Sequence, residues 1–226
     1  MEEKKIKIKK AIICVACIIG ICSISAIAGE YSESESFDFS KWGQILKNDA
    51  EESSELRVRT AEEETLVQGK EAAVSESDVD MGTQFYQAAG FTKEDAREQS
   101  VEYFKEYEAM YAEAIAKGYS VTDEEIEDYL EEMKASIFSD TTDETTQEQY
   151  REMFGQFDSE EDYWNYEKEV YRKQLPIEKM VSDLEREYFN QESANEEGWD
   201  EYFENYKADL VRKQNYQNYA PSLNCN

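Results

Sequence analysis

The sequence has no histidine, only two prolines and only nine glycines among its 226 residues. Without histidine, the chain cannot form a His-ligated zinc site, a Ser-His-Asp triad or a Cys-His catalytic pair. β-Sandwiches and β-barrels use glycine and proline in their many turns, so the scarcity of both argues against those folds. The missing residues therefore favour a mainly α-helical protein without these catalytic centres.

Basic residues are also few, with 24 Lys and Arg against 53 Asp and Glu, a net charge of -29. A nucleic-acid-binding protein needs a basic surface to neutralise phosphates, so this chain is expected to repel DNA and RNA. An acidic surface also resists self-association and favours basic partners. The apolar fraction of 40% is enough to form a core, so wholesale disorder is not expected.

The N-terminus has the layout of a secretory signal peptide over residues 1–28. A lysine-rich start is followed by apolar or small residues from 11 to 22 and a small-x-small triplet at 26–28. Cleavage is expected between Ala28 and Gly29. The alternative is an uncleaved anchor helix, because the apolar stretch approaches the length that spans a membrane. Both interpretations place the protein outside the cytoplasm, in the cell envelope or secreted.

The mature chain has too few cysteines for a disulfide bond within the chain. Three of the four cysteines lie within the predicted signal peptide, which leaves Cys225 near the C-terminus. One cysteine cannot make an intramolecular disulfide, so the fold is not expected to depend on disulfides. We interpret Cys225 as a bystander, with pairing to another chain as the alternative.

The remaining chain divides into three parts. Residues 29–64 are rich in Glu, Ser and Asp and predict a disordered acidic tether, interrupted by a short amphipathic segment around Trp42 that we interpret as a helical turn docking on the main domain. Residues 65–217 form the expected helical domain, and 218–226 form a polar tail. Capping residues, glycine stops and apolar spacing predict a short β-hairpin at 66–74 and helices at 75–90, 92–117, 122–138, 160–189 (bent or split at Pro176) and 195–214.

No motif points to catalysis or to a cofactor. Glycine-rich phosphate loops, a metalloprotease HExxH and an EF-hand loop are all absent. Asp140, Asp143 and Glu144 are able to hold a divalent cation weakly, but a solvated loop at 139–147 is the favoured interpretation. We therefore expect no catalytic residue, no metal and no cofactor, and we expect the protein not to be an enzyme.

Aromatic and methionine residues are unusually dense on the predicted helices. Core packing is the favoured interpretation for each one taken singly. Together they suggest an adaptable surface for extended peptides, because methionine repacks easily and tyrosine combines an apolar face with a polar tip. The candidate peptide-binding residues are Tyr103, Tyr107, Met110, Tyr111, Tyr129, Met133, Tyr163, Trp164, Tyr171 and Met180.

Two segments carry a resemblance to a known family. Val74-Ser75-Glu76-Ser77-Asp78-Val79 and residues 112–126, which read AEAIAKGYSVTDEEI, resemble the N-terminal chaperone domain of SurA-like and PrsA-like extracytoplasmic foldases. Val67-Gln68-Gly69 is similar to that family's Val-Asn-Gly turn, but it departs in two ways, because Gln replaces Asn and the gap to Val74 is longer. The resemblance implies an intertwined multi-helix chaperone domain. It also implies that the family's parvulin prolyl isomerase domain is missing, since no segment fits it and histidine is absent.

The sequence thus predicts an exported, mainly α-helical domain that binds unfolded or nascent polypeptides without catalysis. The alternative function is a non-catalytic adaptor or structural protein of the envelope that binds one folded partner. Contact with a membrane is expected only through an uncleaved N-terminal segment.

Overall fold

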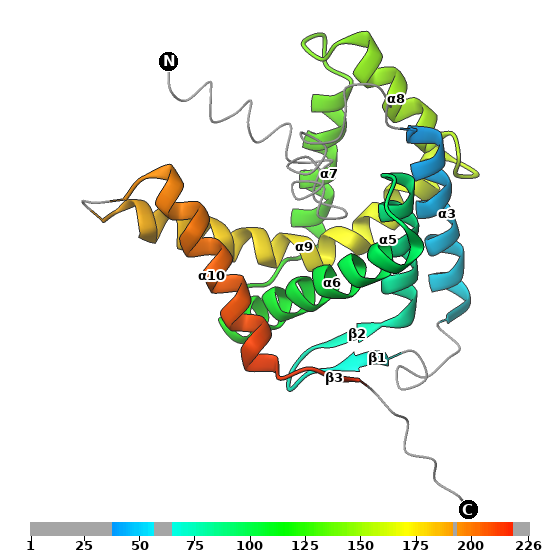
Figure 1. Ribbon diagram of the computed structural model, residues 1–226. Coiled ribbons are helices and arrows are strands. Elements are labelled where there is room, and N and C mark those ends of the chain that lie inside the picture. Colours follow the sequence, from blue (N-terminus) through cyan, green and yellow to red (C-terminus); the bar gives the residue numbers. More distant parts are fainter. Residues whose placement is uncertain (1–37, 57–64, 192–193, 219–226) are drawn as a thin grey trace, which may run out of the picture.

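The computed structural model describes residues 38–56, 65–191 and 194–218. These residues form seven helices and three short strands, which confirms the predicted mainly α-helical fold (Figure 1). The predicted signal peptide, its cleavage position at Ala28 and Gly29, and Cys225 all lie outside the described residues. Within the described ranges, no helix has the length and apolar character needed to cross a membrane.

Helix α3 (Phe39–Leu56) begins where only a short amphipathic segment was predicted, and it is 18 residues long. Its apolar row, Trp42, Ile45 and Leu46, is buried in the main core. Gly43 lets α3 approach helix α8 closely, because a Cβ at this position would lie 2.3 Å from the carbonyl oxygen of Met153. The amphipathic segment therefore docks on the main domain, and its helix is longer than the single turn that was expected and runs into the stretch from residue 51 that was predicted as a linker.

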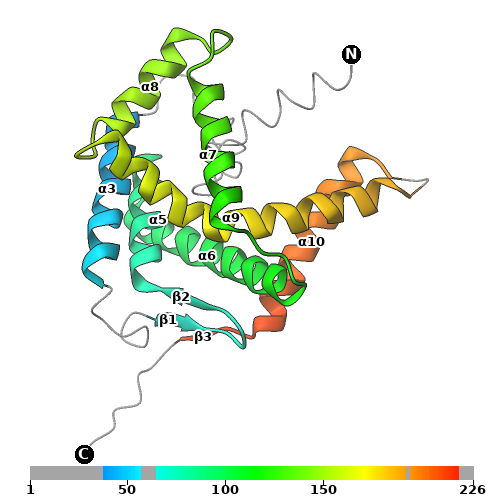
Figure 2. The ribbon, with the colours of Figure 1, turned by 180° about the vertical axis from the view of Figure 1, so that it is seen from behind.

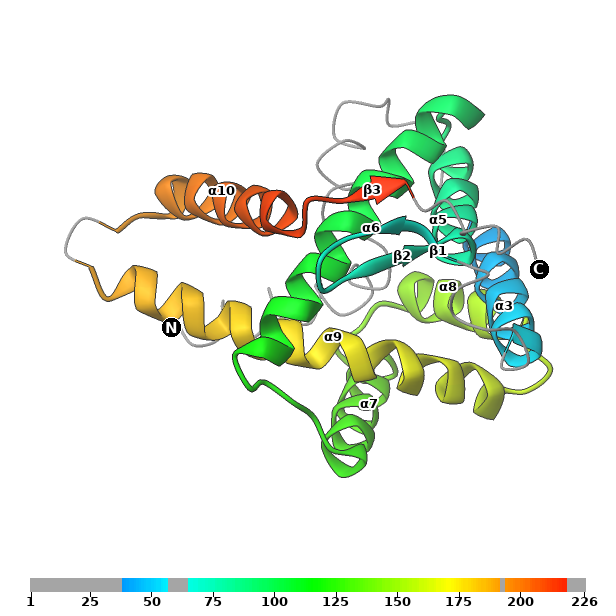
Figure 3. The same cartoon turned by 90° about the horizontal axis from the view of Figure 1, so that it is seen from below.

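The hairpin is present as predicted and gains a third strand. Strands β1 (Thr65–Gln68) and β2 (Ala73–Ser75) pair antiparallel, with Val67 opposite Val74. Strand β3 (Gln217–Asn218), from the other end of the domain, pairs antiparallel with β1 (Figure 3). The sheet order is β2-β1-β3. Pairing of β3 was not predicted, because two exposed polar residues carry no strand pattern.

Helices α5 (Glu76–Ala88), α6 (Lys93–Ala116) and α7 (Asp123–Ile137) begin at the predicted capping residues. The side chains of Ser75, Thr92 and Thr122 each accept a hydrogen bond from the backbone N–H three residues later. Glycine follows α5 and α6 at residues 90 and 118, where φ is +96° and +88°. These conformations suit glycine because it lacks a Cβ.

One prediction in the middle of the chain is wrong in detail, and another, which allowed two outcomes, is narrowed to one of them. Helix α8 spans Glu144–Phe154, so Asp143 is its N-cap and accepts a hydrogen bond from Thr146 N at 2.9 Å. The expected loop therefore ends four residues early, and two of its candidate cation ligands belong to a helix start. Helix α9 (Glu160–Phe189) continues through Pro176, so of the two expected outcomes the split is absent, and the helix bends near its middle instead (Figure 2). Pro176 is fully buried, and packing around it outweighs the loss of one backbone donor.

The long helix α9 connects two clusters of buried side chains. The larger core gathers residues from α3, the hairpin, α5, α6, α7, α8 and the first half of α9. The smaller core lies between the ends of α6 and α9 and helix α10 (Glu196–Gln214), which was predicted at this position. Beyond this smaller core, the end of α9 and the start of α10 project from the body as a helical hairpin (Figures 1 and 2).

Candidate functional site

Half of the predicted peptide-binding side chains are buried in the two cores. Met133, Tyr163 and Tyr171 lie in the larger core, and Met110 and Met180 lie in the smaller one. The interpretation of core packing therefore describes these five residues. These five side chains lie on the inward faces of their helices, where neighbouring helices bury them.

The other five candidates are partly buried, and they do not form one surface. Trp164 donates a hydrogen bond to Glu160 at 3.0 Å. Tyr129 packs against Tyr171, with ring centres 5.0 Å apart. Only Tyr103 and Tyr107 line the same depression, while the ring of Tyr111 faces Lys173 Nζ at 5.7 Å.

This depression is a groove of about 670 Å³ between α3, α5, α6 and α9. Helix α6 contributes Tyr103, Phe104 and Tyr107 to its wall, and the rings of Tyr103 and Tyr107 stack 6.1 Å apart at an interplanar angle of 23°. Across the groove, Phe157 and Tyr166 lie with ring centres 6.0 Å apart. The groove therefore has aromatic faces on opposing elements.

The orientation of these aromatic side chains is fixed by contacts with their neighbours. The hydroxyl of Tyr166 donates to Asp49 Oδ2 on α3 at 3.0 Å. Tyr103 also meets Phe104 edge to face, with ring centres 5.0 Å apart. Burial raises the pKa of Tyr107 well above its usual range, so this phenol stays neutral at physiological pH. The groove thus presents neutral rings with polar tips.

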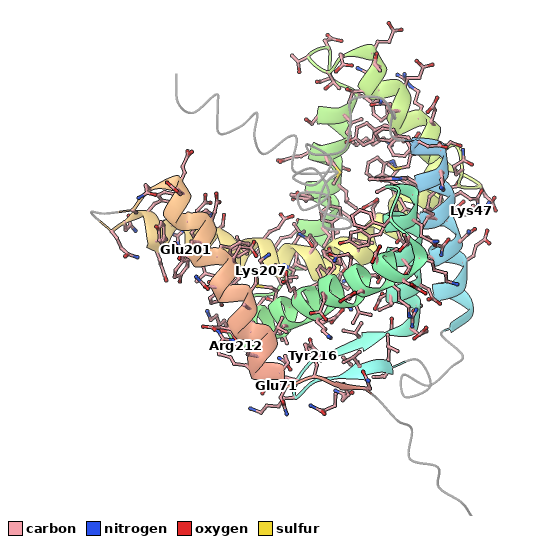
Figure 4. The ribbon with its side chains drawn as sticks, viewed as in Figure 1. Lys47, Glu71, Glu201, Lys207, Arg212 and Tyr216 are labelled. Carbon is pink, nitrogen blue, oxygen red and sulfur yellow. The ribbon has the colours of Figure 1, made fainter. Side chains whose placement is uncertain are left out.

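Carboxylates dominate the charge of the groove. Its two lysines are both engaged, since Lys47 Nζ lies 2.6 Å from Asp158 Oδ1 and Lys173 Nζ lies 2.8 Å from Glu108 Oε1. Figure 4 shows Lys47 on α3. The negative side chains outnumber the positive ones seven to two, so the groove favours cationic ligands. The seven acidic residues are Asp49, Glu51, Asp78, Glu108, Asp158, Asp162 and Glu169.

Glu108 occupies the most sheltered position among these carboxylates. Its side chain is 10% exposed and forms the ion pair with Lys173. Burial raises the pKa of Glu108, and the neighbouring ammonium of Lys173 opposes that rise. This pair neutralises itself inside the groove, while the more exposed carboxylates remain at its rim.

Sequence reasoning missed most of the groove. Lys47, Asp49 and Ala50 follow the amphipathic segment whose docking was expected as a single helical turn, and the acidic residues were interpreted only as solvated surface. The apolar row Trp42, Ile45 and Leu46 predicted that this segment docks on the domain, but not that its helix continues far enough to line a groove. Once α3 docks through this row, the adjacent face of α3, with Lys47, Asp49 and Ala50, lies beside α9 and lines the groove.

A second depression of about 570 Å³ lies between α7, α8 and the start of α9. Lys134 and Arg151 line it together with the rings of Phe138 and Phe154. Arg151 lies over the Phe138 ring at 5.5 Å. This depression lacks the surplus of carboxylates, since Glu160 is its one acidic residue beside Lys134 and Arg151. Variants in it therefore serve as controls for variants in the acidic groove.

In the part of the chain that the structure describes, no cluster of acidic or cysteine side chains is suited to hold a metal ion. Comparison with known proteins gives no matching family model, no matching curated protein and no matching solved structure. We therefore infer the function of this protein from the geometry and charge of the groove.

Proposed function

We propose that this protein binds extended, positively charged segments of unfolded or nascent polypeptides in the groove between α3, α6 and α9. The observation that carries the proposal is the combination of opposed aromatic faces with seven carboxylates against two engaged lysines. The groove's volume falls within the range of about 300–1,000 Å³ that is usual for ligand sites. The proposed role is that of a holdase or folding helper and requires no catalytic residue.

The chemistry of the groove suits cationic segments that also carry apolar or aromatic groups. Tyr103, Tyr107 and Tyr166 offer apolar faces for such side chains, and their rings attract lysine and arginine through cation–π contacts. The carboxylates at the rim add a long-range attraction that is not specific to one sequence. Such a site accepts many clients, as the resemblance to extracytoplasmic chaperones also suggests.

Affinity is expected to be weak, because a flexible client loses conformational entropy when it is ordered. Added salt should weaken binding only in part, since screening removes the charge attraction and leaves the apolar contacts. A groove that worked by charge alone would lose its ligand at high salt.

The test is a titration of the full-length chain with an unstructured peptide of Lys, Tyr, Gly and Ser, compared with a Glu, Tyr, Gly and Ser counterpart. We expect the lysine peptide to bind, and we expect Tyr103→Ser to weaken this binding about tenfold because an aromatic contact is lost. Arg151→Ser in the second depression is the matched control and should leave binding unchanged. Circular dichroism verifies that each variant is folded.

Equal binding of the two peptides, or unchanged binding by a folded Tyr103→Ser variant, would contradict the proposal. Loss of binding in the Arg151→Ser control would move the site to the second depression. Complete loss of binding at about 0.5 M salt would show that the aromatic faces take no part.

A further inference from the structure

The helical hairpin of α9 and α10 extends beyond the end of α6, the helix that packs against its base (Figures 1 and 2). At its base, α6 packs against both α9 and α10 and completes a three-helix arrangement. Lys117, directly after the end of α6, donates a hydrogen bond to the hydroxyl of Tyr206 at 3.0 Å. Further out, α9 and α10 continue without α6. The last buried residue of α9 is Leu184, and the first buried residue of α10 is Leu210.

The outer part of this hairpin carries a cluster of exposed and partly exposed aromatic side chains. Phe189 and Tyr202 are 41% and 39% exposed, and they are two of the three large apolar side chains that are exposed in the described ranges. Tyr188 lies between them, with its ring centre 5.2 Å from that of Tyr202. Trp199 stacks on Phe203 at 5.4 Å. We call these five residues the arm surface.

The start of α10 is an amphipathic helix whose aromatic face is only partly covered. Its aromatic residues at 199, 202, 203 and 206 follow the i, i+3, i+4, i+7 spacing of one helix face. Three of them, Trp199, Phe203 and Tyr206, pack against the smaller core but remain partly exposed, and none of the residues from 196 to 209 is fully buried. An apolar face of this kind on a projecting element marks an interaction site.

The charges around the arm surface select the partner. Residues 183–189 contain three carboxylates and residues 194–207 contain five, and nearly all of them are exposed. The two cations of these segments are already paired, Arg186 with Asp183 at 2.8 Å and Lys207 with Glu204 at 2.9 Å. A second copy of this chain would bring the same carboxylates face to face and be repelled, whereas a cationic partner is attracted.

We propose that the arm surface binds a cationic amphipathic helix of another polypeptide, which lies across α9 and α10 in the position that α6 leaves vacant. The aromatic row of α10 from 199 to 206 is about 10 Å long, which matches two turns of such a helix. Trp199 and the two exposed rings serve as the apolar anchors, and the flanking carboxylates meet lysine or arginine at the edges of the partner's apolar stripe. This site is separate from the groove, since Glu201 on the arm and Lys47 beside the groove lie on opposite sides of the molecule (Figure 4).

The probe is a 14-residue peptide of Leu and Lys in a helical amphipathic pattern, titrated into the full-length chain by fluorescence anisotropy. The same peptide with Glu in place of Lys is the charge control. We expect only the Leu/Lys peptide to bind, and we expect the double variant Phe189→Ser, Tyr202→Ser to weaken binding about tenfold or more, because the partner no longer buries two aromatic side chains.

Three further variants distinguish the arm surface from the rest of the molecule as the place where the peptide binds. Ile115→Ser removes the third exposed apolar side chain, which lies on α6 and outside the arm surface, and it should leave binding unchanged. Tyr103→Ser in the groove should also leave binding of the helical peptide unchanged, so failure of the groove proposal and failure of this one are distinguishable. Glu197→Gln with Glu201→Gln keeps the aromatic surface, and it should weaken binding most at low salt.

The proposal is overturned if the Leu/Glu peptide binds as well as the Leu/Lys peptide, or if the folded double variant binds with the affinity of the unchanged chain. It is also overturned if Tyr103→Ser abolishes binding, because the groove would then be the site. Sedimentation that shows a dimer dissociated by the double variant would identify a second copy of this chain as the occupant instead.

Discussion

Glu167 is a carboxylate inside the larger core, between two buried tyrosines on the same face of α9. Tyr163 lies one turn before it and Tyr171 one turn after it, and all three side chains are buried. Neither carboxylate oxygen of Glu167 has a hydrogen-bond partner of good geometry. Burial raises the pKa of Glu167 to about 8, and the hydroxyl of Tyr163 offsets only part of that rise. The side chain is therefore held in its neutral, protonated form at neutral pH.

This residue predicts that the fold loses stability as pH rises. The unfolded chain releases the proton of Glu167 near pH 4.5, whereas the folded chain keeps it until about pH 8. Between these values the free energy of unfolding should fall by about 1.4 kcal/mol for each pH unit. Glu167→Gln cannot ionise, so its stability relative to the unchanged chain should increase by about 3 kcal/mol between pH 4.5 and pH 7.

Urea denaturation of both proteins at several pH values measures this difference. Glu169→Gln is the matched control, because Glu169 lies on the exposed side of the same helix. A constant difference between Glu167→Gln and the unchanged chain across this range would show that Glu167 is ionised in the folded state. Tyr163, Glu167 and Tyr171 follow the i, i+4, i+8 spacing of one helix face, so the burial of Glu167 could be predicted from the sequence. Its lack of a partner was not, because that depends on which side chains surround it.

At the level of elements, the close contact of α3 with α8 depends on one glycine. A Cβ on Gly43 would lie 2.3 Å from the carbonyl oxygen of Met153 and 2.9 Å from its Cα. Both are backbone atoms, so the contact cannot be relieved by turning a side chain. The two helices would have to separate, and the groove's wall on α3 would move with them.

Gly43→Ala should therefore destabilise the protein by about 2 kcal/mol, which is typical when extra atoms are forced into a packed interface. The sign is informative, because the same change in an exposed helix interior stabilises by about 1 kcal/mol. Gln44→Ala, on the exposed neighbour, should have almost no effect. Thermal unfolding followed by circular dichroism measures both variants, and a stabilised Gly43→Ala would mean that α3 is not packed on α8.

The boundaries of most helices were predictable, whereas the partners of the elements were not. Helix ends depend on residues within one turn of the chain, so they can be predicted from the sequence. Examples are the caps Ser75 and Thr122 and the glycine stops at 90 and 118. The docking of α3 and the pairing of β3 depend on residues far away in the sequence. The groove was hidden for the same reason, because its walls come from four helices that only the tertiary fold brings together.

For the whole molecule, the charge pattern connects the two proposed binding surfaces. The net charge is -29, and lysines beside the groove and on the arm are held by the protein's own carboxylates. The surface is therefore negative on opposite sides of the molecule, which keeps copies of the chain apart. This repulsion benefits a protein that binds unfolded clients with exposed apolar groups. Copies of the chain that each carry a client repel one another and so do not aggregate.

The proposed work on clients outside the cytoplasm requires export. The lysine-rich start and the small-x-small triplet at 26–28 predict that the native protein begins at Gly29. N-terminal sequencing of the protein isolated from its source cells measures this directly. An intact Met1 on a membrane-bound form would show that the segment is an anchor, and an intact Met1 on a cytoplasmic form would contradict export.

The three-stranded sheet has a consequence for the order in which the protein folds. Strand β1 needs β3 on its second edge, and the side-chain oxygen of Gln214 accepts hydrogen bonds from the backbone of Glu71 at 2.8 Å and Ala72 at 3.1 Å. Nearly the whole domain separates these partners along the chain. During N-to-C synthesis, one edge of the hairpin therefore stays open until α10 and β3 have been made. Residues 214–218 act as a latch on the hairpin, so a chain released before Gln214 would keep its first strands exposed, like the clients that we propose it binds.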